Sequence, residues 1–421
     1  MTTPFPTVDE ISRHCLHPNE PETVHIEVHL TGHLDPPRLT ESFTRALTHH
    51  PRILIREAPR HWYTCRYTWE LTNTPDKAPV SFPAPTPNAL EEARTRALTQ
   101  PPPLTTAPPL RLESVPHPET GNTVLFLTIN HTALDAPSGL RVLATTAHLY
   151  GDRDNSPPPA PPPPPRRPAP SDLPAPWARP ARIAPGTPGQ DRPGNGLLLC
   201  DLPVPRRPKS APYTVNDQLM VATARTIAAW NKEQGDHRSR HPHHPLRITM
   251  PVDDRPRDAT MPMGNGTRLV EVPFTASELK QPTPTLLHLT ATRTTALKST
   301  PLPQLGYNTT LLTTPYAPVA WRAAATRTLR RAAAPWTSTT LLSNVGRVPY
   351  PLDFGDGGRA QAVWFSAPAR MPRGLSVTTA STAGRLHLAL RWSRTLLGDG
   401  DGAHLRDLFA HHLQTTQEEA P

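Results

Sequence analysis

The run NSPPPAPPPPPRRPAP, residues 155–170, constrains the fold of this chain more than any other feature. Proline fixes φ and lacks a backbone N–H, so such a run is excluded from helix interiors and central strands and favours extended polyproline II. At about 3.1 Å per residue it could reach about 50 Å, the width of a domain. We therefore expect a linker or surface crossover at 155–195 between two lobes, residues 1–154 and 196–421. A ligand for a proline-binding module is the alternative interpretation.

Proline also accounts for the low apolar content, because 59 of the 421 residues are proline and 36% are apolar. We expect a folded protein of enzyme size with proline-rich loops. Three distant cysteines, Cys15, Cys65 and Cys200, show no metal or redox spacing and predict reduced thiols in a cytoplasmic protein. No signal-peptide pattern opens the chain, and no apolar stretch is long enough to predict a membrane span.

The charge balance is basic, with 44 Lys and Arg against 35 Asp and Glu, a net charge of +9. Nearly all of these cations are arginine, a skew that codon bias explains as readily as a partner does. The arginines are scattered without interleaved aromatic residues, so we do not expect a nucleic-acid partner. An acidic partner, such as a carrier protein or a phosphorylated cofactor, is compatible with the charge.

Both predicted lobes mix strands and helices. In the first lobe, alternating apolar residues predict a strand at 23–32, an apolar run predicts a central strand at 122–130, and helical spacing predicts helices at 36–50, 87–100 and 138–150. In the second lobe, a long helix is predicted at 213–233, a last helix at 402–416, and strands at 246–252, 267–274, 339–345, 374–381 and 385–392. The order lacks the regular alternation of a Rossmann fold or a TIM barrel, so the fold class is α/β of the α+β kind.

The stretch TINHTALDAPSG, residues 128–139, places His131 between the predicted central strand and a helix. An imidazole at such a turn can face a cleft and take a proton from an attacking amine or alcohol. A structural histidine is the alternative. Asp135, followed by Pro137, has the pattern of a helix N-cap.

NHTALDAPSGLRVL resembles the HHxxxDG signature of non-ribosomal peptide condensation domains, which belong to the chloramphenicol acetyltransferase-like acyltransferases. Other segments resemble the family in the expected order, and the resemblance spans about 22–416: ALTHHPRILIRE, TVNDQLMVATARTIAAW, RITMPVDDRPRDATMPMGNG, LLSNVGRV and the ending GRLHLALRW…LRDLFAHHL. The resemblance implies two chloramphenicol acetyltransferase-like lobes that meet in a V around a central tunnel. Donor thioester and acceptor would enter this tunnel from opposite sides.

The resemblance also implies roles for single residues. His131 would be the base, or would position the nucleophile, and Asp135 would be structural through an ion pair with Arg255 in PVDDRP. Two positions depart from the motif, because Asn130 replaces its first histidine and Ala136 replaces its glycine. Ala136 would disfavour positive φ, and we expect Gly139 to restore some flexibility.

For the other residues with reactive or hydrogen-bonding side chains, a structural role is the alternative to a functional one. Ser343 and Asn344 could supply oxyanion or substrate contacts, or they form an ordinary strand-ending turn. DFGDG, residues 353–357, resembles the DFGWG motif of plant acyltransferases and is expected to be structural. We expect a solvated loop around His237, His241, His243 and His244, surface positions for His411 and His412, and no metal site.

The resemblance implies a cytoplasmic acyltransferase of secondary-metabolite biosynthesis. It would move an acyl or aminoacyl group from a thioester, on coenzyme A or on the phosphopantetheine arm of a carrier protein, to the amine or hydroxyl of a small acceptor. No tightly bound cofactor would be needed. Asn130 and Ala136 keep two alternatives open: a degenerate docking platform for a carrier protein, or a tunnel used for cyclisation or rearrangement.

Overall fold

The structure is a computed structural model, and it describes residues 1–61, 63–158, 178–187, 194–235, 244–256, 260–300, 304–305 and 309–417. Its helices are α1 (Thr7–His14), α2 (Pro36–His49), α3 (Ala89–Thr99), α4 (Ala136–Gly151), α5 (Val215–Glu233), α6 (Thr283–Ser299), α7 (Val319–Ala333) and α8 (Asp399–Thr415). Its strands are β1 (Thr2–Pro4), β2 (Thr23–Leu30), β3 (Ile55–Glu57), β4 (Thr68–Leu71), β5 (Val80–Ser81), β6 (Leu110–Pro116), β7 (Thr123–Asn130), β8 (Asn195–Pro203), β9 (Leu246–Asp253), β10 (Thr267–Phe274), β11 (Thr340–Arg347), β12 (Ala360–Ser366), β13 (Leu375–Thr382) and β14 (Arg385–Ser393).

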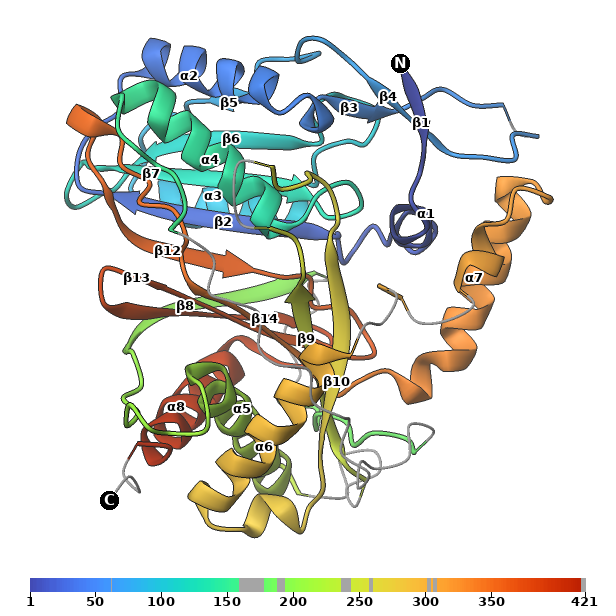
Figure 1. The fold of residues 1–421 in the computed structure, drawn as a ribbon, viewed down its shortest axis with the longest axis vertical. Coiled ribbons are helices and arrows are strands. Elements are labelled where there is room, and N and C mark those ends of the chain that lie inside the picture. Colours follow the sequence, from blue (N-terminus) through green and yellow to red (C-terminus); the bar gives the residue numbers. More distant parts are fainter. Residues whose placement is uncertain are drawn as a thin grey trace.

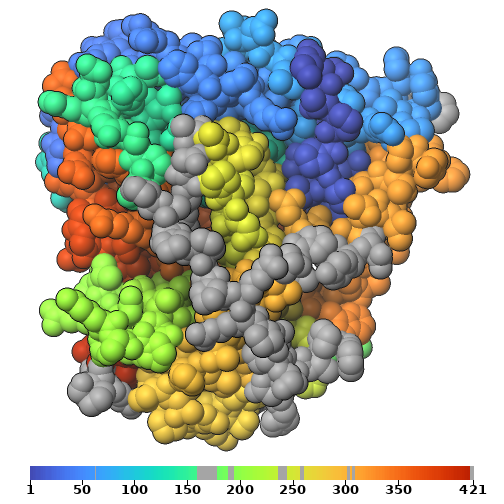
Figure 2. Space-filling model, in the orientation of Figure 1, coloured from blue at the N-terminus to red at the C-terminus, as the bar shows by residue number. Residues whose placement is uncertain are grey.

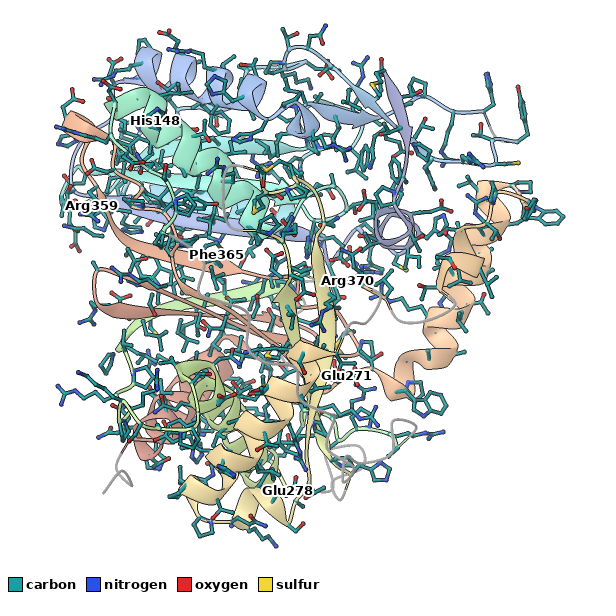
Figure 3. The ribbon with its side chains drawn as sticks, in the orientation of Figure 1. His148, Glu271, Glu278, Arg359, Phe365 and Arg370 are labelled. Carbon is teal, nitrogen blue, oxygen red and sulfur yellow. The ribbon has the colours of Figure 1, made fainter. Side chains whose placement is uncertain are left out.

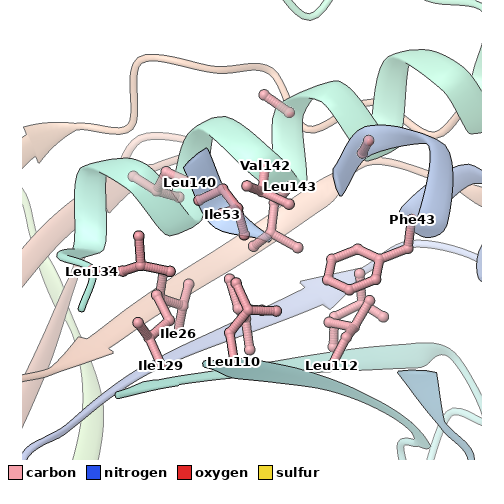
Figure 4. Packing of buried hydrophobic residues seen from close by; sticks show 14 of the residues in the cluster. Ile26, Phe43, Ile53, Leu110, Leu112, Ile129, Leu134, Leu140, Val142 and Leu143 are labelled. Atoms are coloured by element: carbon pink, nitrogen blue, oxygen red, sulfur yellow. The ribbon is translucent and has the colours of Figure 1, made fainter. Parts of the chain in front are cut away.

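A five-stranded sheet of order β12-β2-β7-β6-β5 organises the first half. Strand β7 lies between β2 and β6, and all eight of its residues are buried, as expected of a central strand. The apolar residues of β2 and β7 that face α2 and α4 form the first core, which includes Ile26, Ile129, Leu140 and Phe43 (Figure 4). The end of β7 therefore delivers the residues after Asn130 to one rim of a buried sheet.

A six-stranded sheet of order β10-β9-β11-β13-β14-β8 organises the second half. Helices α5, α6 and α8 lie together at the lower end of the molecule and contribute to a second core with Trp230, Leu287, Phe409 and Phe274 (Figure 1). Helix α5 begins with a capping box in which Thr214 and Asp217 bond each other's backbone N–H groups. Strands β9 and β10 form a hairpin that rises from this half towards the first (Figure 1).

A strand from the second half of the chain joins the two halves by pairing with the first sheet. Strand β12 lies between β11 and β13 in sequence, yet it pairs antiparallel with β2 at the edge of the first sheet. It also packs against β13 and β14 of the second sheet. Figure 1 shows β12 beside β2, where the two halves meet, and Figure 3 labels Phe365 on this strand. The second half thus supplies part of the first sheet.

Buried polar contacts reinforce this junction. Arg391 of β14 is fully buried and donates to the carbonyl oxygens of Thr23 (2.8 Å) and Pro21 (3.2 Å). Trp364 of β12 donates through Nε1 to the carbonyl oxygen of Cys200 at 3.3 Å. The bonds from Arg391 fix the start of β2, and with it the segment around residue 22, against the second sheet, and the Trp364 bond ties β12 to β8.

The predicted linker is only partly described. Of residues 155–195, the stretches 159–177 and 188–193 lie outside the described residues, and they include most of the proline run. Ala181, Ile183 and Ala184 are buried in the second core. The boundaries at 154 and 196 therefore remain predictions.

The DFGDG segment joins the ends of α2 and α4. Phe354 is buried with its ring edge-on to Tyr150, and Arg38 forms an ion pair with Asp356. An ideal Cβ on Gly355, which has φ +65°, would lie 2.9 Å from the carbonyl oxygen of Gly151, so a side chain would collide there. The contacts of this segment are structural, as expected. No helix within the described ranges is both long and apolar enough to cross a bilayer.

Candidate functional site

His131 is the first residue of a tight turn between β7 and α4. Its backbone N–H donates to the carbonyl oxygen of Glu22 at 2.8 Å, and its Nδ1 lies 3.1 Å from the carbonyl oxygen of Leu134. A carbonyl oxygen only accepts, so Nδ1 must carry a proton in this hydrogen bond. In the neutral ring the lone pair is then on Nε2, to which no described residue bonds. Partly buried His131 is therefore held in the tautomer that a base requires.

Asn130, which stands where the motif has its first histidine, serves the backbone of the turn. Its Nδ2 donates to the carbonyl oxygen of Pro102 at 2.9 Å, and its Oδ1 accepts from the N–H of Thr132 at 3.1 Å. The side chain is buried, and both ends of the amide are occupied. Asn130 thus shapes the turn.

Asp135 combines the two roles that the sequence suggested, helix cap and ion-pair partner. One carboxylate oxygen accepts from the N–H (3.1 Å) and the hydroxyl (2.8 Å) of Ser138, which caps α4. The other accepts from Arg255 Nη2 at 2.7 Å and from the N–H of Gly266 at 3.0 Å. The predicted pair with Arg255 is present, and it joins the two halves.

Arg255 is itself held on both sides. Its guanidinium also contacts Asp253, with Nε 2.8 Å from Oδ1. Burial lowers the pKa of Arg255, but the hydrogen bond to Asp253 and the charge of Asp135 outweigh burial and raise it overall. An ideal Cβ on Gly266 would lie 2.2 Å from Arg255 Nε, so only glycine leaves room for this side chain.

The tip of the β9–β10 hairpin closes over the His131 turn, which sequence reasoning did not predict. Asn265 Nδ2 lies 3.1 Å from the carbonyl oxygen of His131, 3.0 Å from that of Thr132 and 3.0 Å from Asp9 Oδ1. The N–H of Gly264 donates to the hydroxyl oxygen of Ser138 at 3.1 Å. Figure 2 shows this yellow segment at the surface between the dark blue α1 and the green α4. The sequence of this segment, TMPMGNG, contains no pattern that predicts these contacts.

Two acidic side chains that the sequence did not single out lie near His131. Asp9, on α1, is buried and accepts from Asn265 and from Trp69 Nε1 at 2.9 Å. Burial raises the pKa of Asp9 to about 6, and these hydrogen bonds and the charge of His131 offset only part of the rise.

Glu22 pairs with Arg370 at the junction of the two halves, where Figure 3 labels Arg370. Burial alone would raise the pKa of the Glu22 carboxyl. The charge of Arg370, their hydrogen bond and the charge of His131 together hold that pKa below its usual value. A negative charge therefore persists beside the turn.

Gly139 and Ala136 act differently from what the sequence suggested. Neither has positive φ, so the expectation that Gly139 restores flexibility is wrong. Both lie in the first turn of α4. A Cβ on Gly139 would lie 2.4 Å from Ile129 Cδ1 and 3.0 Å from Ile26 Cδ1, so glycine allows α4 to pack closely on the sheet. Ala136 begins the helix without backbone strain.

Ser343 and Asn344 lie within β11 and not at its end. Asn344 Oδ1 accepts from Thr379 Oγ1 (3.1 Å) and from the N–H of Gly346 (2.8 Å), and its Nδ2 lies 3.3 Å from Asn216 Oδ1. The Ser343 hydroxyl has no hydrogen bond among the described residues. None of these contacts brings either residue to the His131 turn, so their oxyanion role remains a prediction.

The other predicted histidines lie away from this turn. His237, His241 and His243 are outside the described residues, and His244 donates to the carbonyl oxygen of Arg179. His411 is exposed, whereas His412 is half-buried and its pKa is lowered to about 4, mainly by burial and then by the charge of His411. The expectation that His412 is a surface residue is therefore wrong. Across the parts of the chain that the structure describes, no cluster of three or more His, Cys, Asp or Glu side chains could hold a metal ion.

Two surface hollows lie elsewhere. One of about 620 Å³ is lined by Pro36, Thr40 and Phe82, and another of about 470 Å³ by Arg56, Arg60 and Thr105. His131 lines neither of them. The passage expected to reach His131 between the two halves therefore remains a prediction.

Comparison with solved structures establishes the fold of this chain. The condensation domain of the monacolin K polyketide synthase MokA aligns with a TM-score of 0.65 at 11% identity, over 100% of this chain and 98% of that domain. The first condensation domain of the CDA synthetase aligns at 0.64 and 13% identity, over 100% and 97%. The chain has the condensation-domain fold.

A third structure of this fold was determined as a complex. It is a mutant of the starter condensation domain of the rhizomide synthetase RzmA in complex with C8-CoA and Leu-SNAC. It aligns at 0.64 and 14% identity, over 98% of this chain and 93% of that one. No protein-family model and no curated protein sequence matches the chain. The two-lobe architecture expected from the sequence is confirmed.

Proposed function

We propose that this condensation-fold protein is an acyltransferase of secondary-metabolite biosynthesis. It moves an acyl or aminoacyl group from a thioester to the amine or hydroxyl of a small acceptor. The thioester is carried by coenzyme A or by the phosphopantetheine arm of a carrier protein, and it acts as a co-substrate. These donors and the three free thiols fit a cytoplasmic reaction.

The observation that carries this proposal is the tautomer of His131. Its Nδ1–H is committed to the carbonyl oxygen of Leu134, which leaves the Nε2 lone pair as a proton acceptor. As the acceptor nitrogen or oxygen attacks the thioester carbonyl carbon, Nε2 takes its proton. The tetrahedral intermediate then collapses, the C–S bond breaks, and the leaving thiolate receives the proton from Nε2.

Charged side chains lie around the His131 turn. The carboxyl groups of Asp9 and Glu22 both lie close enough to this imidazole to interact with its charge. Asp135, bonded to Arg255, acts as the structural support that holds the turn. The Ser343 hydroxyl and the amide of Asn344 are the proposed oxyanion donors in the second half.

The proposal is tested by His131→Ala, with His148→Ala as the matched control. His148 lies on α4 away from the turn, and its Nδ1 bonds the carbonyl oxygen of Arg153 (Figure 3). Octanoyl-CoA and acyl-pantetheine thioesters are combined with a panel of amines and alcohols, and products are measured by mass spectrometry. Loss of a base typically lowers the rate about 10²–10⁴-fold. Full rate in folded His131→Ala would refute the role.

Asn130 favours one second candidate function. Because both ends of its buried amide bond the backbone, the side chain is committed to the shape of the turn, which suits a docking platform that has lost acyl transfer. This candidate predicts carrier-protein binding by calorimetry with no product across the whole thioester panel. A product without added acyl mass would instead indicate cyclisation or rearrangement.

A further inference from the structure

Arg373, just before β13, is a partly buried cation that bonds no carboxylate among the described residues. Its Nε donates to the hydroxyl of Ser338 at 3.1 Å, and its Nη2 donates to that of Thr249 at 3.3 Å. A guanidinium carries five N–H donors, so most of those on Nη1 and Nη2 have no partner in the described parts of the chain. Arg255, by contrast, bonds two carboxylates. Burial without a bonded anion is costly, so fold stability alone does not account for Arg373.

The surroundings of Arg373 disfavour its charged form. Burial lowers the pKa of this guanidinium. The charges of Glu271 and Glu22 offset only part of that fall, and the positive charges of Arg330 and Arg182 add to it. A further anion bonded directly to Arg373 would supply the stabilisation that its neighbours do not.

The two hydroxyls beneath Arg373 supply one more donor. Ser338 and Thr249 are buried, and their Oγ atoms lie 2.6 Å apart. One hydroxyl hydrogen forms this bond, and both oxygens also accept from Arg373. The other hydroxyl hydrogen has no acceptor within the described ranges. The groups left free around Arg373 are therefore donors, which select an anionic acceptor.

Arg373 belongs to a group of charged side chains at the junction of the two halves, which we call the arginine cluster. Its cations are Arg182, Arg247, Arg330, Arg370 and Arg373, and they act on the carboxyl groups of Glu22 and Glu271. Arg370 pairs with Glu22, and Arg247 lies 3.5 Å from Glu271. Five arginines against two glutamates leave an excess of positive charge, which attracts a negatively charged small molecule.

The arginine cluster meets the His131 turn at Glu22. The charges of His131 and of Arg373 both act on the Glu22 carboxyl group. The carbonyl oxygen of Glu22 also accepts from the N–H of His131 at 2.8 Å. Figure 3 labels two members of the cluster, Glu271 on the hairpin and Arg370 above it. Arg373 thus lies in the neighbourhood of the proposed base but belongs to the second half of the chain.

We propose that Arg373 binds the carboxylate of the acceptor, which is then an amino or hydroxy carboxylic acid. The inference rests on the proposed function and adds the chemical class of its acceptor. A planar guanidinium holds a planar carboxylate through two parallel hydrogen bonds, and both Nη atoms of Arg373 retain N–H groups for them. The acyl donor has no such carboxylate, because its carboxyl group is already a neutral thioester.

The phosphate of a donor arm is the weaker occupant of this subsite. A phosphate group presents acceptor oxygens on several sides, whereas the described residues around Arg373 offer free donors from one guanidinium and one hydroxyl. The experiment therefore includes a phosphate probe.

Binding is measured first without an acyl donor, by saturation-transfer NMR. The probes are glycine, 4-aminobutanoate, 6-aminohexanoate and 8-aminooctanoate, each compared with its carboxamide, which lacks the negative charge. The series of chain lengths covers different separations between Arg373 and His131. We expect at least one carboxylate to bind about tenfold more tightly than its carboxamide, and Arg373→Met to remove this difference.

Variants at position 373 separate binding from stability. Because the wild-type cation bonds no carboxylate, Arg373→Met should melt at or above the wild-type temperature. Arg373→Lys should retain part of the binding, since an ammonium group keeps the charge without the planar fork. Arg45→Met, which removes an exposed arginine of α2, is the matched control and should bind the probes as the wild type does.

Product formation is then measured with octanoyl-CoA and with octanoyl-pantetheine, which has no phosphate. Arg373→Met should raise KM for the best-bound carboxylate about 10–100-fold and leave KM for its carboxamide unchanged. The effect should be the same with both donors, because the subsite serves the acceptor.

Equal binding of carboxylates and carboxamides, or carboxylate binding that survives Arg373→Met, would overturn the subsite. A melting temperature of Arg373→Met well below that of the wild type would assign Arg373 to the fold instead. Inorganic phosphate that binds through Arg373, with no binding of any aminocarboxylate, would assign the site to a donor phosphate. Carboxylate binding that depends on Arg373, with no product from either donor, would sink the acyl transfer and leave the subsite.

Discussion

The His131 turn and the hairpin tip that closes over it are stabilised in different ways. Inside the turn, the bonds are local, from the N–H of Thr132 to Asn130, from His131 to Leu134 and from Ser138 to Asp135. The described residues of the tip bond mainly across the junction, since Arg255 reaches Asp135 and Asn265 reaches Asp9 and the turn's carbonyl oxygens.

The difference shows what each region contributes. Local bonds give the turn its shape and fix the imidazole tautomer, so this part depends on a short stretch of sequence. The tip adds charge and enclosure that exist only when both halves are folded together. Changes in the tip should therefore destabilise the joined protein, whereas changes beneath the turn should disturb packing within the first half.

The largest effect is expected from Arg255→Met. It leaves the buried Asp135 carboxylate without its cation, which typically costs about 3–5 kcal/mol. Chemical denaturation should show this loss in the free energy of unfolding. The double variant Arg255→Met/Asp135→Asn should recover part of it, because the unpaired charge is removed. A free energy of unfolding for Arg255→Met within about 1 kcal/mol of the wild-type value would contradict the importance of the ion pair between Asp135 and Arg255.

The next effect is a pH dependence that originates at Asp9. Its pKa is raised from 3.8 to about 6, mainly by burial, so between these values the folded protein binds more protons than the unfolded chain. The free energy of unfolding therefore falls as pH rises through this window. Asp9→Asn removes the titration.

The variant's stability relative to the wild type should then increase by up to about 3 kcal/mol between about pH 4 and pH 7. Urea denaturation at a series of pH values measures this difference. Asp399→Asn, at an exposed carboxyl of α8, is the matched control and should follow the wild type. If the free energies of unfolding of Asp9→Asn and of the wild type changed in parallel with pH, Asp9 would not be buried beneath the tip.

A smaller effect is expected beneath the turn, from Gly139→Ala. The added methyl would lie 2.4 Å from Ile129 Cδ1, and overpacking of this kind costs about 1–3 kcal/mol. Gly400→Ala, in α8 with open space around its Cβ position, should be neutral or slightly stabilising. Thermal unfolding compares the two variants. Equal melting temperatures would mean that α4 does not pack as closely on the sheet as the structure shows.

Strongly periodic segments could be predicted from the sequence. Strands β2 and β7 and helices α2, α4 and α5 occur where apolar spacing placed them. Helices α6 and α7 were not predicted, and in α6 the threonine and alanine residues leave no clear apolar stripe. The place of β12 was not predictable either, since a short apolar segment does not reveal which sheet edge it joins.

The candidate site divides in the same way. Asp135 as an N-cap follows from local spacing, and its partner Arg255 followed from the family resemblance. Asn265 and Asp9 were missed because the bonds that join Asn265 to the turn and to Asp9 span more than a hundred residues and carry no local pattern. The role of Gly139 was misjudged because close packing and positive φ both require glycine, and only the structure separates them.

The tautomer of His131 is the most direct test of the proposed site. Nitrogen-15 NMR of histidine-labelled protein, at a pH where the ring is neutral and with His131→Gln for assignment, reports which nitrogen holds the proton. The structure predicts the proton on Nδ1 and an unprotonated Nε2. A proton found on Nε2 would contradict the assignment of His131 as the base.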